Sequence, residues 1–282
     1  MQKSVTRFVS IAAGFAVCAV TALAAGPSNF DNGTDTGCSA LPSFLNFQTA
    51  LVQAVRMENS GLNAHMWGTI VDRAGNVCAV VFSGSTVGSQ WLGSRAIAAQ
   101  KASTANDFSL DSSAVSDGSG LALALSTANL YSATQPGGSL YGLQASNPVD
   151  TSVAYASQYQ YFGTPQDPMV GNRVGGINVF GGGLALYGPG HVLLGAVGVS
   201  GDTSCADHFI AWRTRNILGL DHLGTVIPGP AGLFNKDVTH PDNIIFDITP
   251  NPNGGTGASA SGFGHPSCLN TGDPSKLPAV SN

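Results

Sequence analysis

The residues of this chain that could do chemistry are spread along its length. Six histidines are present, and no two of them have the spacing of metal ligands: His65, His191, His208, His222, His240 and His265. One short group, His65-Met66-Trp67, offers an imidazole, a thioether and an indole ring. Because side chains alternate along a strand, His65 and Trp67 would share one face and Met66 would take the other. These three side chains therefore cannot all meet one ligand, and each histidine taken alone fits a surface or capping role.

Motifs of the common catalytic classes are missing from the sequence. There is no nucleophile elbow, P-loop or HExxH zinc helix. Ser200 lies between Gly198 and Gly201, where the G-x-S-x-G spacing is absent and no base is marked as its partner. Gly195, Gly198 and Gly201 fall inside or at the end of a predicted strand, so they form no dinucleotide fingerprint. The sequence marks no catalytic residue and leaves open whether a substrate is turned over.

The N-terminus has the pattern of a secretory signal peptide. Residues 1–24 combine Lys3 and Arg7, an apolar run over 11–23 and a small-x-small site that ends at Ala24. The apolar run is short for a membrane span, and the residue before Cys18 is not the small one that a lipoprotein site requires. We therefore expect cleavage near Ala24 and a periplasmic or secreted protein.

Net charge and cysteine content limit the kinds of partner and of covalent cross-link that we expect for the exported chain. Loss of Lys3 and Arg7 leaves nine basic against 16 acidic residues, a net charge of −7, which argues against nucleic acid and anionic membranes as partners. Four cysteines remain after cleavage: Cys38, Cys78, Cys205 and Cys268. An even number in an exported chain predicts two disulfides, with three possible pairings. No CxxC or CxxCH occurs, so neither a zinc knuckle nor covalent haem attachment is indicated.

Hydrophobic periodicity predicts helices alternating with hairpins. Helical spacing covers 41–59, 94–108, 121–131 and 205–218, and strand-like runs cover 66–72, 77–82, 184–187 and 191–199. Glycine-rich turns join the paired strands. Gly195 and Gly198 within the last strand imply a close neighbour, either a helix packed on the sheet or a ligand. A valine at position 198 should then be destabilising.

Three stretches resemble the GlcG/HbpS family, whose haem-binding, haem-degrading domain also ends some cobalamin adenosyltransferases. The first is GGGLALYGPGHVLLGAVGVSGDTSCADHFIAW over 181–212, which has the family's triple glycine, its glycine-rich strand and Asp207 in the last helix. The others are TIVDRAGN over 69–76 and KASTA over 101–105. Asp202 replaces a family glycine, and Cys205 replaces the usual acidic residue. The resemblance covers roughly 41–219.

The resemblance implies a fold and a ligand. The fold would be α/β (α+β), profilin-like, with one antiparallel sheet of about five strands and packed helices. The ligand would be haem, or another small anion, bound between the helix of Lys101 and Thr104, a glycine loop and the turn before the last helix. Thr104 is implied near the iron, with His65 as the fallback ligand, and the remaining site residues are Lys101, Gly137, Gly138, Gly198, Gly201 and Asp207. Alternatively, Thr104 bonds to its own helix and Lys101 is a core lysine that reaches solvent.

Domain organisation and function are predicted as follows. A loose segment over 25–40 precedes the family domain at 41–219, which contains an insertion at 144–175. An extension follows over 220–282, flexible at 251–266. We expect an exported haem-binding or haem-handling homo-oligomer. The alternatives are an accessory protein or enzyme for a small oxidised metabolite of the glycolate type, and a self-assembling structural module.

Overall fold

The computed structural model describes residues 37–111, 113–114, 122–224, 228–255 and 257–282. The predicted signal peptide and its cleavage site near Ala24 lie outside the described residues, as does most of the predicted loose segment 25–40. No described helix is long and apolar enough to cross a membrane.

The core of the fold is a four-stranded antiparallel sheet. Its strands are β1 (Trp67–Asp72), β2 (Val77–Phe82), β3 (Gly183–Gly188) and β4 (Val192–Ser200), in the order β2-β1-β4-β3. β1 joins β2 through a tight turn in which Gly75 has a positive φ of 86° and the Asp72 carboxylate accepts the Asn76 N–H. β3 and β4 form the predicted second hairpin, and β4 pairs with β1 as well, so the two hairpins make one sheet.

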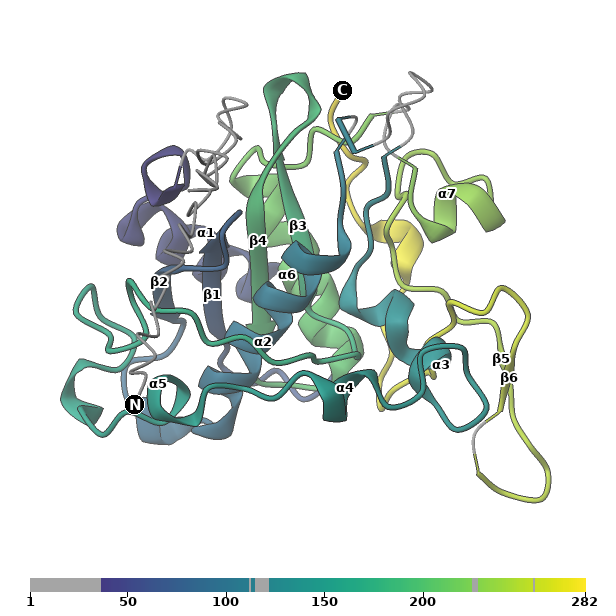
Figure 1. Ribbon diagram of the computed structural model, residues 1–282, viewed down its shortest axis with the longest axis horizontal. Coiled ribbons are helices and arrows are strands. Elements are labelled where there is room, and N and C mark those ends of the chain that lie inside the picture. The colour runs from purple at the N-terminus through teal and green to yellow at the C-terminus, as the bar shows by residue number, and fades with distance from the viewer. Residues whose placement is uncertain (1–36, 112, 115–121, 225–227, 256) are drawn as a thin grey trace, which may run out of the picture. The chain divides into compact units, whose positions relative to one another are not determined.

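Helices cover both faces of this sheet (Figure 1). α2 (Gly93–Phe108) packs on one face, whereas α1 (Phe44–Met57) and α6 (Ser204–Ile217) pack on the other. Because both faces are buried, the strands are continuous apolar runs without polar alternation. The N-termini of α1 and α6 are capped by Ser43 and Thr203, whose side chains accept backbone N–H groups of Asn46 and Ala206.

The α/β fold class with an antiparallel sheet is therefore confirmed, with four strands in the main sheet. Short elements complete the described chain: α3 (Tyr131–Thr134), α4 (Leu143–Ser146), α5 (Thr151–Ala154), α7 (Pro230–Phe234), and a separate pair of β5 (Ile248–Thr249) and β6 (Ala258–Ser259). The helix expected over 121–131 is wrong for 122–126. There the chain is extended, because Leu123 bridges to Leu110 and the Ala124 N–H bonds to Pro228 O.

Two disulfides are formed, as predicted, and each ties one flanking segment to the family-like region. Cys38 is bonded to Cys78 of β2, and Cys268 is bonded to Cys205 of α6. The extension after residue 219 is also held by polar contacts to α6. Arg215 forms a buried ion pair with Asp242 at 2.6 Å, and the Trp212 indole donates to Pro278 O at 2.9 Å. The extension thus forms part of the core.

The segment expected to be an insertion, 144–175, packs on α2. Its Asp167 forms a buried ion pair with Arg95 of α2, and the Phe162 ring lies 3.8 Å from the Arg95 guanidinium carbon. Several tyrosines of the segment remain exposed at the surface: Tyr155, Tyr159 and Tyr161.

Candidate functional site

Lys101 lies at the centre of the predicted site, and it is completely buried. Its ammonium is 2.6 Å from Asp207 Oδ2 and donates to Val199 O at 3.0 Å, just where β4 ends. Burial lowers the pKa of Lys101 and raises the pKa of Asp207 to about 6, while the attraction between the two opposes both shifts. Such a pair is costly to break, because removing one partner leaves a buried charge uncompensated.

Asp207 also accepts hydrogen bonds from backbone N–H groups of the turn before α6, which was expected to line the ligand site. Its Oδ1 accepts from the backbone N–H of Gly201 at 3.1 Å and of Asp202 at 2.8 Å. The Lys101 cation and these two donors therefore have an acceptor within the chain, and a ligand would have to displace it.

Thr104 is buried one turn further along α2, with its hydroxyl fully engaged. It donates to Gln100 O at 2.8 Å and accepts from the Asn178 N–H at 2.9 Å. The first bond is the return to its own helix that was the alternative to a ligand contact. The second bond joins α2 to the segment that leads into β3. The expected role of Thr104 near an iron atom stays a prediction.

The strand glycines allow close packing of backbone on backbone. A Cβ on Gly198 would lie 2.0 Å from Ala98 O and 2.5 Å from Ala102 N, both in α2. The neighbour implied by this glycine is thus a helix. Gly201 has a φ of +157°, and a Cβ there would lie 2.4 Å from His65 O. Gly201 therefore lets the segment before β1 approach the end of β4.

Gly137 and Gly138 lie in a different place from Lys101. They line a pocket of about 340 Å³ together with Ser132 and residues near β6, including Ser259 and Gly262. That pocket contains no residue of α2 or of the turn 198–207. The three elements expected to enclose one ligand do not line it together.

A larger pocket, of about 560 Å³, opens beside His65. It is lined by 62–65, from the segment before β1, and by 88–91, from the segment before α2. Trp91 and Leu62 are 60% and 52% exposed, so large apolar surfaces face solvent here. Gln90 fixes the two walls, because its side-chain amide donates to His65 O and to Gly201 O.

The imidazole of His65 is available for a ligand. It lies exposed, with its ring against the edge of Phe82 at 5.8 Å, and within the described residues it forms no hydrogen bond. Phe82 packs in turn on Trp67, whereas Met66 belongs to the core on the opposite face of the sheet. The predicted alternation of these three side chains is confirmed.

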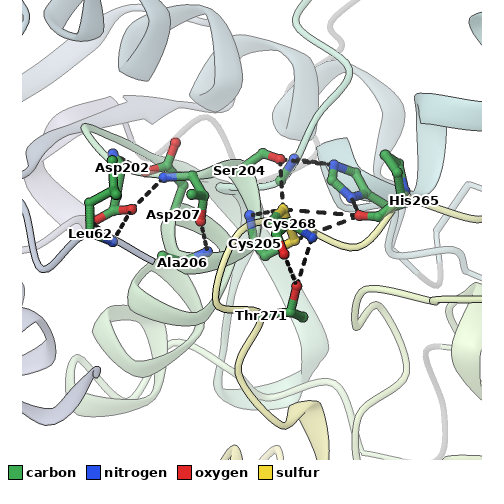
Figure 2. Close-up of a disulfide and its surroundings, with 12 residues drawn as sticks. Leu62, Asp202, Ser204, Cys205, Ala206, Asp207, His265, Cys268 and Thr271 are labelled. Carbon is green, nitrogen blue, oxygen red and sulfur yellow. Dashed lines mark hydrogen bonds between the residues drawn. A yellow bond between two sulfur atoms is a disulfide. The ribbon is translucent and has the colours of Figure 1, made fainter. Parts of the chain in front are cut away.

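Asp202, which replaces a family glycine, closes a second potential anion site (Figure 2). Its carboxylate accepts the backbone N–H groups of Leu62, Ala64 and Thr203 at 2.6 to 2.9 Å. Three N–H groups that converge on one point form an anion-binding site. The chain fills that site with its own carboxylate at the rim of the His65 pocket.

Sequence reasoning missed a polar cluster at the start of α6, shown in Figure 2. Ser204 Oγ lies 3.2 Å from His265 Nε2 and 3.4 Å from Cys268 Sγ, beside the bond to Cys205. His265 is 1% exposed, and burial lowers its pKa to about 4, so its imidazole is neutral at pH 7. Its Nδ1 donates to Pro266 O at 2.7 Å. A backbone carbonyl thus occupies the place of a triad carboxylate, and the pair has no catalytic triad.

One sequence signal could have pointed to this cluster. His265 and Cys268 are three residues apart, a spacing that lets two side chains meet at one centre. Their contact with Ser204 and Cys205, about sixty residues earlier in the chain, is visible only in the fold. The same holds for Gln90 and Trp91, which approach His65 from another segment.

Comparison with known proteins places the chain in a family. The family model described as "Haem degrading protein HbpS-like" matches residues 46–214, more than half of the chain. No curated protein matches the chain. The solved structures that are similar to it include two crystal structures. One is a crystal structure of a PduOC–haem complex, with 22% identity over 61% of this chain and 89% of that chain, and a TM-score of 0.40. The other is the protein ORFY of Klebsiella pneumoniae, of the family DUF336, with 23% identity over 63% and 90% and a TM-score of 0.39.

The match runs from α1 into the last turn of α6 and includes all four strands of the main sheet. The chain belongs to the HbpS-like family of haem-degrading proteins.

Proposed function

We propose that this protein is an exported haem-binding protein of the GlcG/HbpS type. The observation that carries the proposal is the family match over residues 46–214, because that family is described by its action on haem. Two disulfides support export, since such bonds persist in oxidising compartments. The signal-peptide pattern at residues 1–24 supports it from the sequence.

The residues around His65 fit a haem group better than those around Lys101. Histidine is a common axial ligand of haem iron, the His65 imidazole is exposed with both ring nitrogens unoccupied within the described residues, and the Trp91 indole offers a flat apolar surface beside it. The pocket lining contains no lysine or arginine, so the two propionates would meet solvent and the polar groups of Asn63 and Ser89. The Lys101 ammonium and the Thr104 hydroxyl are already hydrogen-bonded inside the protein, to Asp207, Val199 O and Gln100 O.

The roles of the chain's own residues follow from this geometry. His65 would hold the iron, Leu62 and Trp91 would cover the apolar ring, and Gln90 would keep His65 in place through its backbone carbonyl. Haem, when bound, supplies a redox-active iron centre at the protein surface. We expect a homo-oligomer as well. The exposed apolar side chains in and next to this pocket, Leu62, Trp91 and Leu92, provide surface for contact with a second copy.

A haem titration followed by the Soret band tests the site. His65→Ala should weaken haem binding at least tenfold, whereas His222→Ala, which removes a histidine outside the pocket, should leave it unchanged. Two further variants probe the Lys101 region: Thr104→Val, and Lys101→Met combined with Asp207→Asn, which removes both buried charges at once. Thermal melts establish that each variant is folded.

The outcomes separate the two locations. Loss of binding in folded Thr104→Val or in the double variant, with His65→Ala unaffected, would move the site to α2. No saturable binding by the wild type would refute the haem proposal and favour a small oxidised metabolite as ligand.

A further inference from the structure

The disulfide at the start of α6 lies in a set of metal-ligand atoms that haem binding does not use. Cys205 Sγ, Cys268 Sγ and a ring nitrogen of His265 all lie within 4.8 Å of one another. They come from two distant segments, α6 and the extension, which the fold brings together (Figure 2). Two thiolates and an imidazole are a ligand set that Zn²⁺ prefers, and a tetrahedral zinc ion needs its ligand atoms roughly 3.5–3.8 Å apart. The three residues therefore need only small movements to reach a zinc geometry once the two sulfurs are no longer bonded.

The surroundings stabilise the deprotonated ligands. The Cys205 backbone N–H donates to Cys268 Sγ at 3.2 Å, at the N-terminus of a 14-residue helix. The N–H groups and the dipole at a helix N-terminus stabilise a nearby negative charge, and the thiolate is the form of cysteine that binds metal. His265 is oriented like a metal ligand, since its Nδ1–H bonds to a backbone carbonyl and its Nε2 faces Ser204 and the disulfide.

We propose that reduction of the Cys205–Cys268 bond creates a binding site for a thiophilic dication, and that Zn²⁺ is the preferred ion. The three protein ligands of this ion are Cys205, Cys268 and His265. The fourth coordination position, on the side of Ser204, is taken by a water molecule or a hydroxyl group. The reductant is a small dithiol. It gives two electrons to the S–S bond and is oxidised to its own disulfide, leaving two thiols in the protein. Zn²⁺ then displaces one proton from each thiol.

Access for the reductant is from the side of Cys268. Cys205 is fully buried, but Cys268 is only half-buried and lies next to Leu269, which is 68% exposed. An attacking thiolate would thus form the mixed disulfide with Cys268 and release Cys205 at the helix N-terminus, where its negative charge is stabilised.

The second disulfide offers a poorer site and serves as the internal control. Cys38 and Cys78 have Asp72 as their third neighbour. Both carboxylate oxygens of Asp72 already accept hydrogen bonds from Asn76, at 2.8 and 2.9 Å. A carboxylate oxygen is a harder ligand than an imidazole nitrogen, and this makes the cluster the weaker binder of a thiophilic ion.

Cobalt titration of the full-length protein tests the proposal. The protein is reduced with dithiothreitol, desalted under nitrogen and titrated with Co²⁺, whose thiolate charge-transfer and tetrahedral ligand-field bands report its ligands. We expect one equivalent of thiolate-bound Co²⁺, displaced by Zn²⁺, and none in the oxidised protein. The bands should persist in Cys38→Ser/Cys78→Ser and disappear in Cys205→Ser/Cys268→Ser. His265→Asn should weaken Co²⁺ binding at least tenfold. Cys18 is unchanged in every variant, so it does not contribute to the differences between them.

Folding of the reduced chain is measured in parallel by circular dichroism. If the reduced chain is folded, Zn²⁺ should raise its melting temperature and leave that of the oxidised protein unchanged. If it is unfolded, Zn²⁺ should restore structure, because metal binding to a native site is coupled to folding. Absence of the thiolate bands in the reduced protein, folded or not, would overturn the proposal. So would bands of equal strength in Cys205→Ser/Cys268→Ser.

Discussion

The contact between Gly198 and α2 gives a sharp test of how the helix sits on the sheet. In Gly198→Ala the new methyl group would lie 2.0 Å from Ala98 O and 2.5 Å from Ala102 N. A carbon normally approaches a carbonyl oxygen to about 3.3 Å, so α2 would have to move away by roughly 1.3 Å. The atoms it meets belong to helix backbone, which cannot rotate aside as a side chain can.

The cost follows from what α2 buries. Ala98, Ala102 and Ala105 are fully buried, and a radial gap of 0.5–1 Å already forfeits about a quarter to a half of each van der Waals contact. We therefore expect Gly198→Ala to destabilise by about 3 kcal/mol, the upper end of what overpacking usually costs. For a chain of this size the melting temperature should fall by roughly 6–12 °C.

The assay is thermal and urea unfolding of the oxidised protein, with Gly93→Ala as the matched control. Gly93 is the first residue of α2, and a Cβ there would have no atom within 4 Å. The control should be neutral or stabilise by up to about 1 kcal/mol, because alanine restricts the unfolded chain more than glycine does. A Gly198→Ala melting temperature within 2 °C of the wild type, roughly 1 kcal/mol or less, would refute this placement of α2.

Two further predictions concern thiols and pH. Thiol titration of the denatured, unreduced exported protein should detect almost no free thiol, whereas four free thiols would contradict both disulfides. Burial lowers the pKa of His265 to about 4 and the pKa of His208 to about 3. As the pH falls below 6.5, these two histidines take up protons in the unfolded chain before they do so in the folded protein, so the free energy of unfolding decreases. Asp207 opposes this between pH 6 and 4, because burial raises its folded-state pKa to about 6. With two histidines against one aspartate, unfolding free energy should drop by about 3 kcal/mol from pH 7.5 to 4.5. Urea midpoints at the two pH values measure this drop; an unchanged or higher midpoint at pH 4.5 would contradict it.

Local patterns in the sequence were enough to predict the two hairpins and the main helices, whereas the joining of the hairpins into one antiparallel sheet was implied by the family resemblance. The hairpin of β3 and β4 was predicted because Gly188-Pro189-Gly190 separates two apolar runs. The close neighbour of Gly198 was predicted as well, with a helix and a ligand left as alternatives. The helix expected over 121–131 failed at 122–126, since helical spacing of apolar residues cannot reveal that the chain pairs with Leu110 and Pro228.

The candidate site depended on contacts that no local pattern carries. Lys101 was expected to meet a ligand, but Asp207, 106 positions later, forms the ion pair with it. Asp202 was recognised as a departure from the family pattern, yet two of its three N–H partners, those of Leu62 and Ala64, are distant in sequence and became visible only in the fold. A family resemblance identifies residues at which a ligand is expected. Whether the donor groups of those residues are already hydrogen-bonded within this protein depends on the whole fold.

The contacts between α6 and the extension decide when this chain can fold. Arg215, Trp212 and His208 all lie in α6, and all three form hydrogen bonds to residues after position 240, at Asp242, Pro278 and Asn243. A nascent chain that has emerged only as far as residue 219 holds the whole family segment but lacks the partners that these three side chains find in the extension. The native packing of α6 therefore has to wait until the extension has left the ribosome. Synthesis from the N-terminus thus delays folding to its last stage, and under the export proposed above this delay would keep the polypeptide in the unfolded form that Sec-type translocation requires.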